Sequence, residues 1–237
     1  MSRPKGWLLT TRSGSARALH EPWPEPGLVS ARVLCRCEVT GTPALVLGSG
    51  QRDDDVDHGA TGRAGVDVVR RRSGGGAVLV APGAQLWIDV WVPRDDGLWD
   101  DDVVRAAWWF GDTWAQALES FGASGAAVHR GPMVRSAWSD RVCFAGIGPG
   151  EVSIAGRKVV GMSSRRDRAG ARISATLPWR WDPGALLALL AVGDDERNRA
   201  AVELAGAAEG LASVVQRPGQ PGAVFDALVT ELATHLP

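Results

Sequence analysis

The sequence of 237 residues contains no tyrosine and only three cysteines. It also lacks an uninterrupted apolar run of about 18 residues, the length that a transmembrane helix needs, so we expect no membrane span. The scarcity of cysteine, without a signal peptide, indicates a reducing compartment, and we expect a cytoplasmic protein. The formal net charge is −1, which gives no overall attraction to nucleic acid or membrane surfaces, and we expect neither as a partner.

The cysteines give little support for a metal site. Cys35 and Cys37 lie two residues apart on an expected strand and so share one of its faces. This spacing is tighter than that of the usual zinc-binding pairs, and no nearby histidine completes a ligand set. We therefore predict no metal ligands.

The most informative stretch runs from Arg70 to Val78, with the sequence RRRSGGGAV. Apolar, β-branched residues precede and follow it, which indicates a tight connection between two strands. Three glycines (Gly74, Gly75, Gly76) leave the backbone bare, and the arginines add positive charge and bidentate donors. Such a loop suits a nucleotide phosphate, although a flexible hairpin beside a solvated charged edge has the same composition. No G-x-G-x-x-G and no Lys-Ser or Lys-Thr pair follows the glycines.

The hydrophobic pattern predicts an α+β fold, in which helices pack on a mixed β-sheet. We expect residues 1–27 to be a loosely organised N-terminal segment and residues 28–237 to form a single domain that becomes helical from about 182. Negative residues at 100–102 predict the start of a helix that continues to about 121. Asp182 and Pro183 predict an N-cap and first helical position. The expected strands cover 28–39, 43–48, 86–92, 142–144, 152–154, 158–160 and 171–177, and further helices cover 182–190, 195–207 and 221–235.

The stretch from Arg70 to Val78 resembles the RRxSGGGAV signature of the lipoate–protein ligase A family, part of the biotin and lipoate protein ligases. Two more blocks support the resemblance in the right order. Residues 43–51 (PALVLGSGQ) are similar to the family's first core strand and its Gly-x-x-Gln, and residues 156–166 (GRKVVGMSSRR) are similar to its GRKIxGxAxxR segment. The resemblance implies a fold related to class II aminoacyl-tRNA synthetase catalytic domains.

The resemblance also implies a reaction. Lipoate or octanoate and ATP with Mg²⁺ form an acyl adenylate, which a lysine of a lipoyl carrier domain then attacks. That carrier belongs to a 2-oxoacid dehydrogenase or is the H protein of glycine cleavage. Lys158 would reach the acyl carbonyl and phosphate oxygens, where an ammonium stabilises growing negative charge. The acyl-adenylate site would be lined by Arg71, Ser73, Gly74, Gly75, Gly76, Ala77, Gly161 and Ser163.

Cys143 supports an alternative reaction. Some relatives of the ligases are octanoyltransferases, which take the acyl group from octanoyl-carrier protein onto a cysteine. Cys143 lies fifteen residues before Lys158, a distance similar to that in one branch of these transferases. A nearby ammonium would favour the thiolate. The alternative without catalysis is that Cys143 is only a small buried hydrophobic residue on a strand.

The sequence departs from the family pattern at several points. The family follows GGGAV with one residue, His and Asp, where this sequence has Leu79, Val80 and Ala81, and residues 172–174 replace a His-Gly pair. The N-terminal Asn-x-Ala helix and the long C-terminal accessory domain are not recognisable. The protein is therefore a single-domain ligase, a transferase, a ligase that needs a separate accessory chain, or a non-catalytic relative that binds acyl adenylate or a lipoyl domain. Retention of Lys158 with the glycines favours an enzyme, and we favour the ligase.

Overall fold

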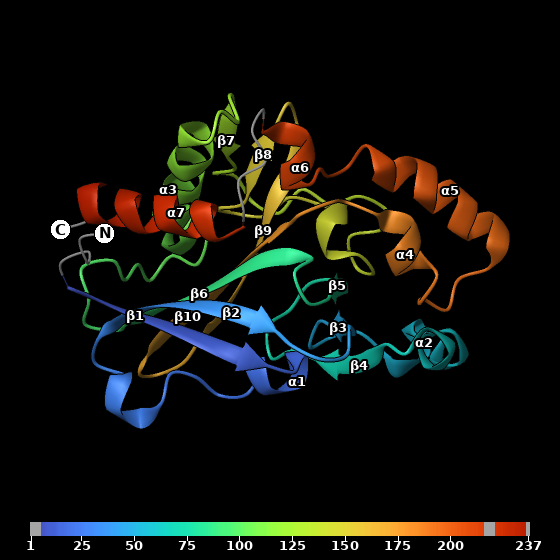
Figure 1. The fold of residues 1–237 in the computed structure, drawn as a ribbon, viewed down its shortest axis with the longest axis horizontal. Helices are drawn as coiled ribbons and strands as arrows, with labels where there is room; N and C mark the ends of the chain where they lie inside the picture. Colours follow the sequence, from blue (N-terminus) through green and yellow to red (C-terminus); the bar gives the residue numbers. More distant parts are fainter. Residues whose placement is uncertain (1–5, 216–220, 236–237) are drawn as a thin grey trace.

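The computed structural model describes residues 6–215 and 221–235. The predicted α+β fold is confirmed, because seven strands form a mixed sheet with helices packed on it (Figure 1). Strands β1 and β2 are parallel, and every other neighbouring pair in this sheet is antiparallel. In spatial order the large sheet contains β1 (Trp7–Gly14), β2 (Arg32–Val39), β6 (Gln85–Pro93), β10 (Gly170–Pro178), β9 (Arg157–Arg166), β8 (Val152–Ile154) and β7 (Ala126–Val128).

A second, three-stranded sheet has β3 at its centre, parallel to β4 and antiparallel to β5. Its strands are β4 (Asp67–Arg70), β3 (Ala44–Leu47) and β5 (Val78–Val80). The helices are α1 (Ala16–Leu19), α2 (His58–Ala64), α3 (Trp108–Ser120), α4 (Pro183–Leu187), α5 (Asp194–Ala205), α6 (Leu211–Val214) and α7 (Pro221–His235). None of these helices is long and apolar enough to cross a membrane.

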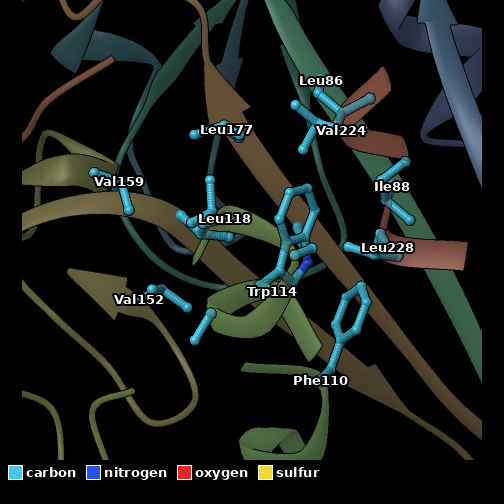
Figure 2. Close-up of a cluster of buried hydrophobic side chains, with 14 of the residues drawn as sticks. Leu86, Ile88, Phe110, Trp114, Leu118, Val152, Val159, Leu177, Val224 and Leu228 are labelled. Atoms are coloured by element: carbon cyan, nitrogen blue, oxygen red, sulfur yellow. The ribbon is translucent and has the colours of Figure 1, made fainter. Parts of the chain in front are cut away.

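Strand β6 is buried on both of its faces. Side chains alternate along a strand, so Leu86, Ile88 and Val90 pack with α3 and α7 in one core cluster. Figure 2 shows Trp114 of this cluster between the two helices and the sheet. The alternate residue Trp87 packs instead with the small sheet and α1. The apolar run in β6 thus places one strand between two cores, and Asp89 lies within it.

The N-terminal segment differs from its expectation. Residues 7–14 are not loosely organised but form β1, which pairs with β2 along its whole length. Trp7 is 2% exposed and belongs to the core, and Ser15 caps α1 by accepting a hydrogen bond from the amide of Ala18. The polar residues in the second half of this edge strand, from Thr10 to Ser13, hide it from a pattern search. Residues 1–5 lie outside the described part of the chain.

Two further elements differ from the sequence-based expectation. Residues 143–145 form a 3₁₀ helix rather than a strand, and the Cys143 carbonyl accepts a hydrogen bond from the Lys158 ammonium. Helix α3 begins at Trp108 rather than near Asp100. The Asp100 carboxylate instead accepts hydrogen bonds from Arg105, which stabilises a turn before the helix. The strands expected at 43–48, 86–92, 152–154 and 171–177 and the helices expected at 182–190, 195–207 and 221–235 are present with slightly shifted ends.

Candidate active site

The glycine loop, defined here as residues 71–77, connects β4 to β5. Two close approaches fix its shape. A Cβ added to Gly48 at the end of β3 would lie 1.8 Å from the carbonyl oxygen of Gly75, and one added to Gly76 would lie 2.5 Å from the backbone nitrogen of Val142. Gly75 has a φ of +96°, a left-handed value that favours glycine. Gly74, by contrast, is exposed and faces open space, so it is accessible to a ligand.

Arg71 lies beneath this loop and is only 6% exposed. Its Nη2 donates to the carbonyls of Gly74 and Gly76 at 2.7 and 2.9 Å, and its Nη1 donates to that of Val46 at 3.3 Å. The Nε–H of Arg71 is buried without an acceptor among the described residues. Most of the hydrogen bonds of the Arg71 guanidinium therefore stabilise the conformation of the loop. Arg72 is exposed beside it.

The Gly-x-x-Gln block closes a second turn against the loop. The Gln51 Oε1 accepts from the amide of Gly48 at 2.9 Å, and its Nε2 donates to the carbonyl of Arg141 at 3.3 Å. The amide of Ser49 donates to the carbonyl of Ser73 at 2.9 Å. The three segments around positions 48, 73 and 141 are thus held together by the Gln51 side chain and by one backbone hydrogen bond.

Lys158 on β9 is almost completely buried, at 3% exposure. Its Nζ lies 2.7 Å from the Oε2 of Glu151 and donates to the carbonyls of Cys143 and Gly146 at 2.8 and 3.1 Å. The ammonium also lies 5.0 Å from the centre of the Phe144 ring. This arrangement needs a compact point charge with several donors, which lysine supplies and arginine does not.

Glu151 is the residue of this site that the sequence analysis missed. Its side chain is 5% exposed, and besides pairing with Lys158 it accepts from the amide of Gly148 at 2.6 Å and from the amide of Met162 at 2.8 Å. One signal in the sequence could have found the pair: Lys158 is one of only two lysines against 24 arginines. Glu151, directly before β8, is the carboxylate closest to Lys158 in the sequence.

Gly161 and Ser163 lie on β9 with Lys158. A Cβ at Gly161 would lie 3.1 Å from the Phe144 ring and 3.2 Å from the Lys158 Cε, so the glycine makes room for these side chains. The Ser73 hydroxyl donates to the Ser163 hydroxyl at 3.0 Å and links the glycine loop to the large sheet. Ala77 is fully buried and donates its amide to the carbonyl of Arg141 at 2.8 Å.

A cavity of about 260 Å³ brings these segments together. Its lining combines the glycines of the loop, the 3₁₀ helix around residue 143 and the β9 residues, including Gly74, Gly75, Gly76, Arg71, Cys143, Glu151, Lys158 and Ser163. The free, half-buried Cys143 therefore reaches the cavity, although its contact with Lys158 is through its carbonyl. The cavity is large enough for several bonded heavy atoms and has a cation in its wall.

A second polar cluster lies behind the loop. Arg172 on β10 contacts the fully buried Asp89 at 2.5 Å, and Trp87 donates to the same carboxylate at 2.9 Å. Burial would raise the pKa of the Asp89 carboxyl, but the charge of Arg172 and hydrogen bonds from Ser174, Trp87 and Arg172 hold that pKa below its ordinary value. Burial, together with the neighbouring arginines, lowers the pKa of His20 to about 4 despite the opposing charge of Asp89.

The other cysteines take no part in the cavity. Cys35 and Cys37 are buried, with their Sγ atoms 4.0 Å apart, and the Cys37 thiol donates to Asp89 at 3.3 Å. Among residues 6–215 and 221–235, no three His, Cys, Asp or Glu side chains are grouped to hold a metal ion.

Residues 35–233 match the protein family described as the lipoyl protein ligase A/B catalytic domain. The structure is similar to that of a bipartite lipoate protein ligase from Thermoplasma acidophilum, reported with its E2 lipoyl domain. The TM-score is 0.70 and the identity 18%, over 95% of this chain and 82% of the other.

Two other solved structures show the same likeness. Lipoate-protein ligase A bound with ATP has a TM-score of 0.66 and 16% identity, over 98% of this chain and 85% of that one. The LipL1 protein of P. falciparum in complex with lipoate has a TM-score of 0.65 and 11% identity, over 97% and 62%. At these identities the likeness shows the fold. No curated protein matches the sequence.

Proposed function

Because the chain belongs to the lipoyl protein ligase A/B catalytic domain family, we propose that it is an ATP-dependent ligase that attaches an acyl group to a lysine of a lipoyl carrier domain. One observation carries the proposal: the buried Lys158 ammonium and the bare glycine loop line the same cavity. A protein that only binds a carrier domain has no need of a buried cation at that place.

In the first step, a carboxylate oxygen of lipoate or octanoate attacks the α-phosphorus of ATP, supplied with Mg²⁺. The new O–P bond forms the acyl adenylate, and pyrophosphate leaves. Gly74, which carries no side chain and faces open space, lets the phosphate approach the backbone. The Lys158 ammonium and the backbone N–H groups of the glycine loop are held in place before the substrate binds, so they stabilise negative charge on the reacting oxygens without reorganisation.

In the second step, the neutral amine of the carrier lysine attacks the acyl carbonyl. The C–N bond of the amide forms, the bond to the phosphate breaks, AMP leaves and the amine loses a proton. Lys158 sits 2.8 Å from the carbonyl of Cys143 and is held by two further partners, so its ammonium is fixed before the substrate arrives. These partners engage all three N–H donors of the ammonium. In our proposal the acyl oxygen takes the place of one backbone carbonyl, and Lys158 then stabilises the oxyanion of the tetrahedral intermediate.

A transferase is the second candidate, and Cys143 at the cavity wall favours it. In that reaction the Cys143 thiolate attacks the thioester of octanoyl-carrier protein, whose thiol leaves. The neutral lysine amine of the lipoyl domain then attacks the new thioester, the amide forms, the Cys143 thiolate leaves and the amine loses a proton. The ligase is better supported, because the glycine loop suits an adenylate phosphate and a transferase forms no adenylate. The Cys143→Ser variant should therefore keep most of its activity.

The test uses the full chain with an unmodified lipoyl domain or H protein. Lipoate-dependent exchange of pyrophosphate into ATP, and a mass increase of the carrier lysine that needs ATP, are the expected results. Exchange without transfer would support a ligase that needs a separate accessory chain. Octanoylation of the lipoyl domain from octanoyl-carrier protein without ATP, with an octanoyl thioester on the protein that Cys143→Ser lacks, would show that the protein is a transferase and not a ligase. Binding of carrier or adenylate analogue with no turnover on either donor would leave a non-catalytic relative.

A further inference from the structure

A narrow, mostly apolar slot opens from the cavity of the candidate active site, and Cys143 and Met162 line both spaces. The slot is also lined by Gly161 on β9, Thr176 on β10 and Trp87 on β6, which are paired in register across the three neighbouring strands. Directly opposed residues share one face of a sheet, so the slot runs across the strands. Neighbouring strands lie about 4.8 Å apart, so two steps give a length of roughly 10 Å, close to that of an extended octanoyl chain.

Apolar side chains from other parts of the fold cover the slot. Val78 and Val80 reach it from β5, and Phe144 reaches it from the 3₁₀ helix. The volume of the slot is about 30 Å³, which is small for its length, so the space suits a single extended hydrocarbon chain. The Lys158 side chain lies against Gly161, at the end of the slot where the acyl carboxyl would react.

His20, which follows α1, lies at the opposite end of the slot. Its imidazole packs against the indole of Trp87, with the ring centres 4.7 Å apart, and lines the slot. His20 also lines a second, polar pocket of about 80 Å³. The imidazole is therefore part of the wall between these two spaces.

Both rings at this end of the slot are anchored to one buried carboxylate. Trp87 donates its Nε1–H to Asp89 at 2.9 Å, and Arg172 forms an ion pair with the same carboxylate. Arg172 also donates to the backbone carbonyls of the residues on either side of His20, at 2.7 and 3.2 Å. Displacing the rings would break hydrogen bonds to a fully buried charge, which is costly.

We propose that His20 sets the chain length of the acyl substrate by closing the slot behind an octanoyl chain. This inference rests on the proposed function and names a residue that selects its acyl group. Burial lowers the pKa of His20 to about 4, so at neutral pH its uncharged ring can contact the apolar end of a chain without burying a charge. A longer chain would have to push His20 off Trp87, and a shorter chain would leave part of the slot unfilled.

The experiment titrates the full chain with hexanoate, octanoate and decanoate by calorimetry. For the wild type we expect affinity to rise about fourfold for each methylene from hexanoate to octanoate. Decanoate should then bind about tenfold or more weakly than octanoate, the scale for overpacking a closed space. His20→Ala should bind decanoate at least as tightly as octanoate, because the space of the imidazole takes the additional methylenes. Such a gain cannot come from a damaged fold.

His20→Trp provides the opposite change, since its larger ring fills part of the slot and should favour hexanoate over octanoate. The control is His58→Ala, which removes an exposed imidazole outside the slot and should keep the wild-type order. The inference is wrong if the wild type binds decanoate as tightly as octanoate, if it binds none of the acids, or if both His20 variants keep the wild-type order. Pyrophosphate exchange with each acid is measured in parallel. Its absence with every acid would count against the ligase, while the order of affinities would still decide the role of His20.

Discussion

A buried ammonium is tolerated only when its partners surround it, and Lys158 meets that condition. The Glu151 carboxylate and two backbone carbonyls contact its Nζ, and the same carboxylate accepts from two backbone amides. Breaking such a pair leaves the other charge buried and uncompensated. The pair therefore fixes the loop at 143–151 against β9 and holds the cation at the cavity wall.

The Lys158→Ala variant should lower turnover by about 10² or more, the scale for losing one electrostatic stabiliser. It should also lower the free energy of unfolding by roughly 3–5 kcal/mol, since Glu151 is left unpaired. The Lys158→Met/Glu151→Gln double variant separates the two effects. It removes both charges, so chemical denaturation should show most of the stability restored while turnover stays low. Recovery of turnover in this double variant would show that Lys158 is only structural.

His20 makes stability depend on pH. Burial lowers its pKa from 6.5 to about 4, so between these values the unfolded chain binds a proton that the folded chain does not. Stability is therefore complete above pH 6.5 and falls as the pH drops toward 4, by on the order of 2–3 kcal/mol. Urea denaturation across this range should show a shallower fall for His20→Gln than for wild type.

The control for this prediction is the exposed His58, whose side chain is 55% accessible. His58→Gln should keep the wild-type pH dependence, because His58 is not among the residues that set the pKa of His20. An identical slope for wild type and His20→Gln would show that His20 is not the group responsible.

At the scale of elements, the glycine loop is defined by what lies against it. Gly48 and Gly76 permit backbone contacts with the rest of the site, and Gly75 needs its positive φ. Substitution at these positions tests folding as much as binding. Gly74 is different, since nothing lies within 4 Å of an added Cβ.

We expect Gly74→Val to fold normally and to lose most of its affinity for a non-hydrolysable acyl-adenylate analogue, because a branched side chain then stands where the phosphate approaches the backbone. Calorimetric titration and thermal unfolding measure the two properties separately. Gly48→Ala is the opposing variant: its Cβ would lie 1.8 Å from a carbonyl oxygen, so it should be destabilised. If a folded Gly74→Val protein bound the acyl-adenylate analogue with wild-type affinity, the glycine loop would be only a turn and not part of the binding site.

At the scale of the whole molecule, the two sheets meet at the site. Strand β6 lies between the core under α3 and α7 and the core under the small sheet, and the Ser73–Ser163 hydrogen bond joins the glycine loop to β9. The N-terminal strand completes the large sheet by covering β2. The reacting groups therefore depend on the packing of segments distant in the sequence.

Trp7→Ala tests whether the N-terminal segment belongs to this packing. Trp7 is 2% exposed, so its removal should lower the free energy of unfolding by about 3–5 kcal/mol in a denaturant titration. The exposed Thr11 on the same strand provides the control, and Thr11→Ala should stay within about 0.5 kcal/mol of wild type. If Trp7→Ala were as stable as this control, the N-terminal segment would be loosely organised, as its sequence suggests, and would not belong to the core.

The sequence by itself determined the α+β class and most strands and helices, because periodicity and turn residues are local properties. The expectation that a glycine loop and Lys158 share a site came from the resemblance to a family. Only the tertiary structure decided that Glu151 partners Lys158, that Arg71 lies under the loop, and that residues 143–145 form a 3₁₀ helix. Each of these depends on contacts between residues that no local pattern links. The role of a buried charge depends on the atoms that surround it, and only folding brings those atoms together.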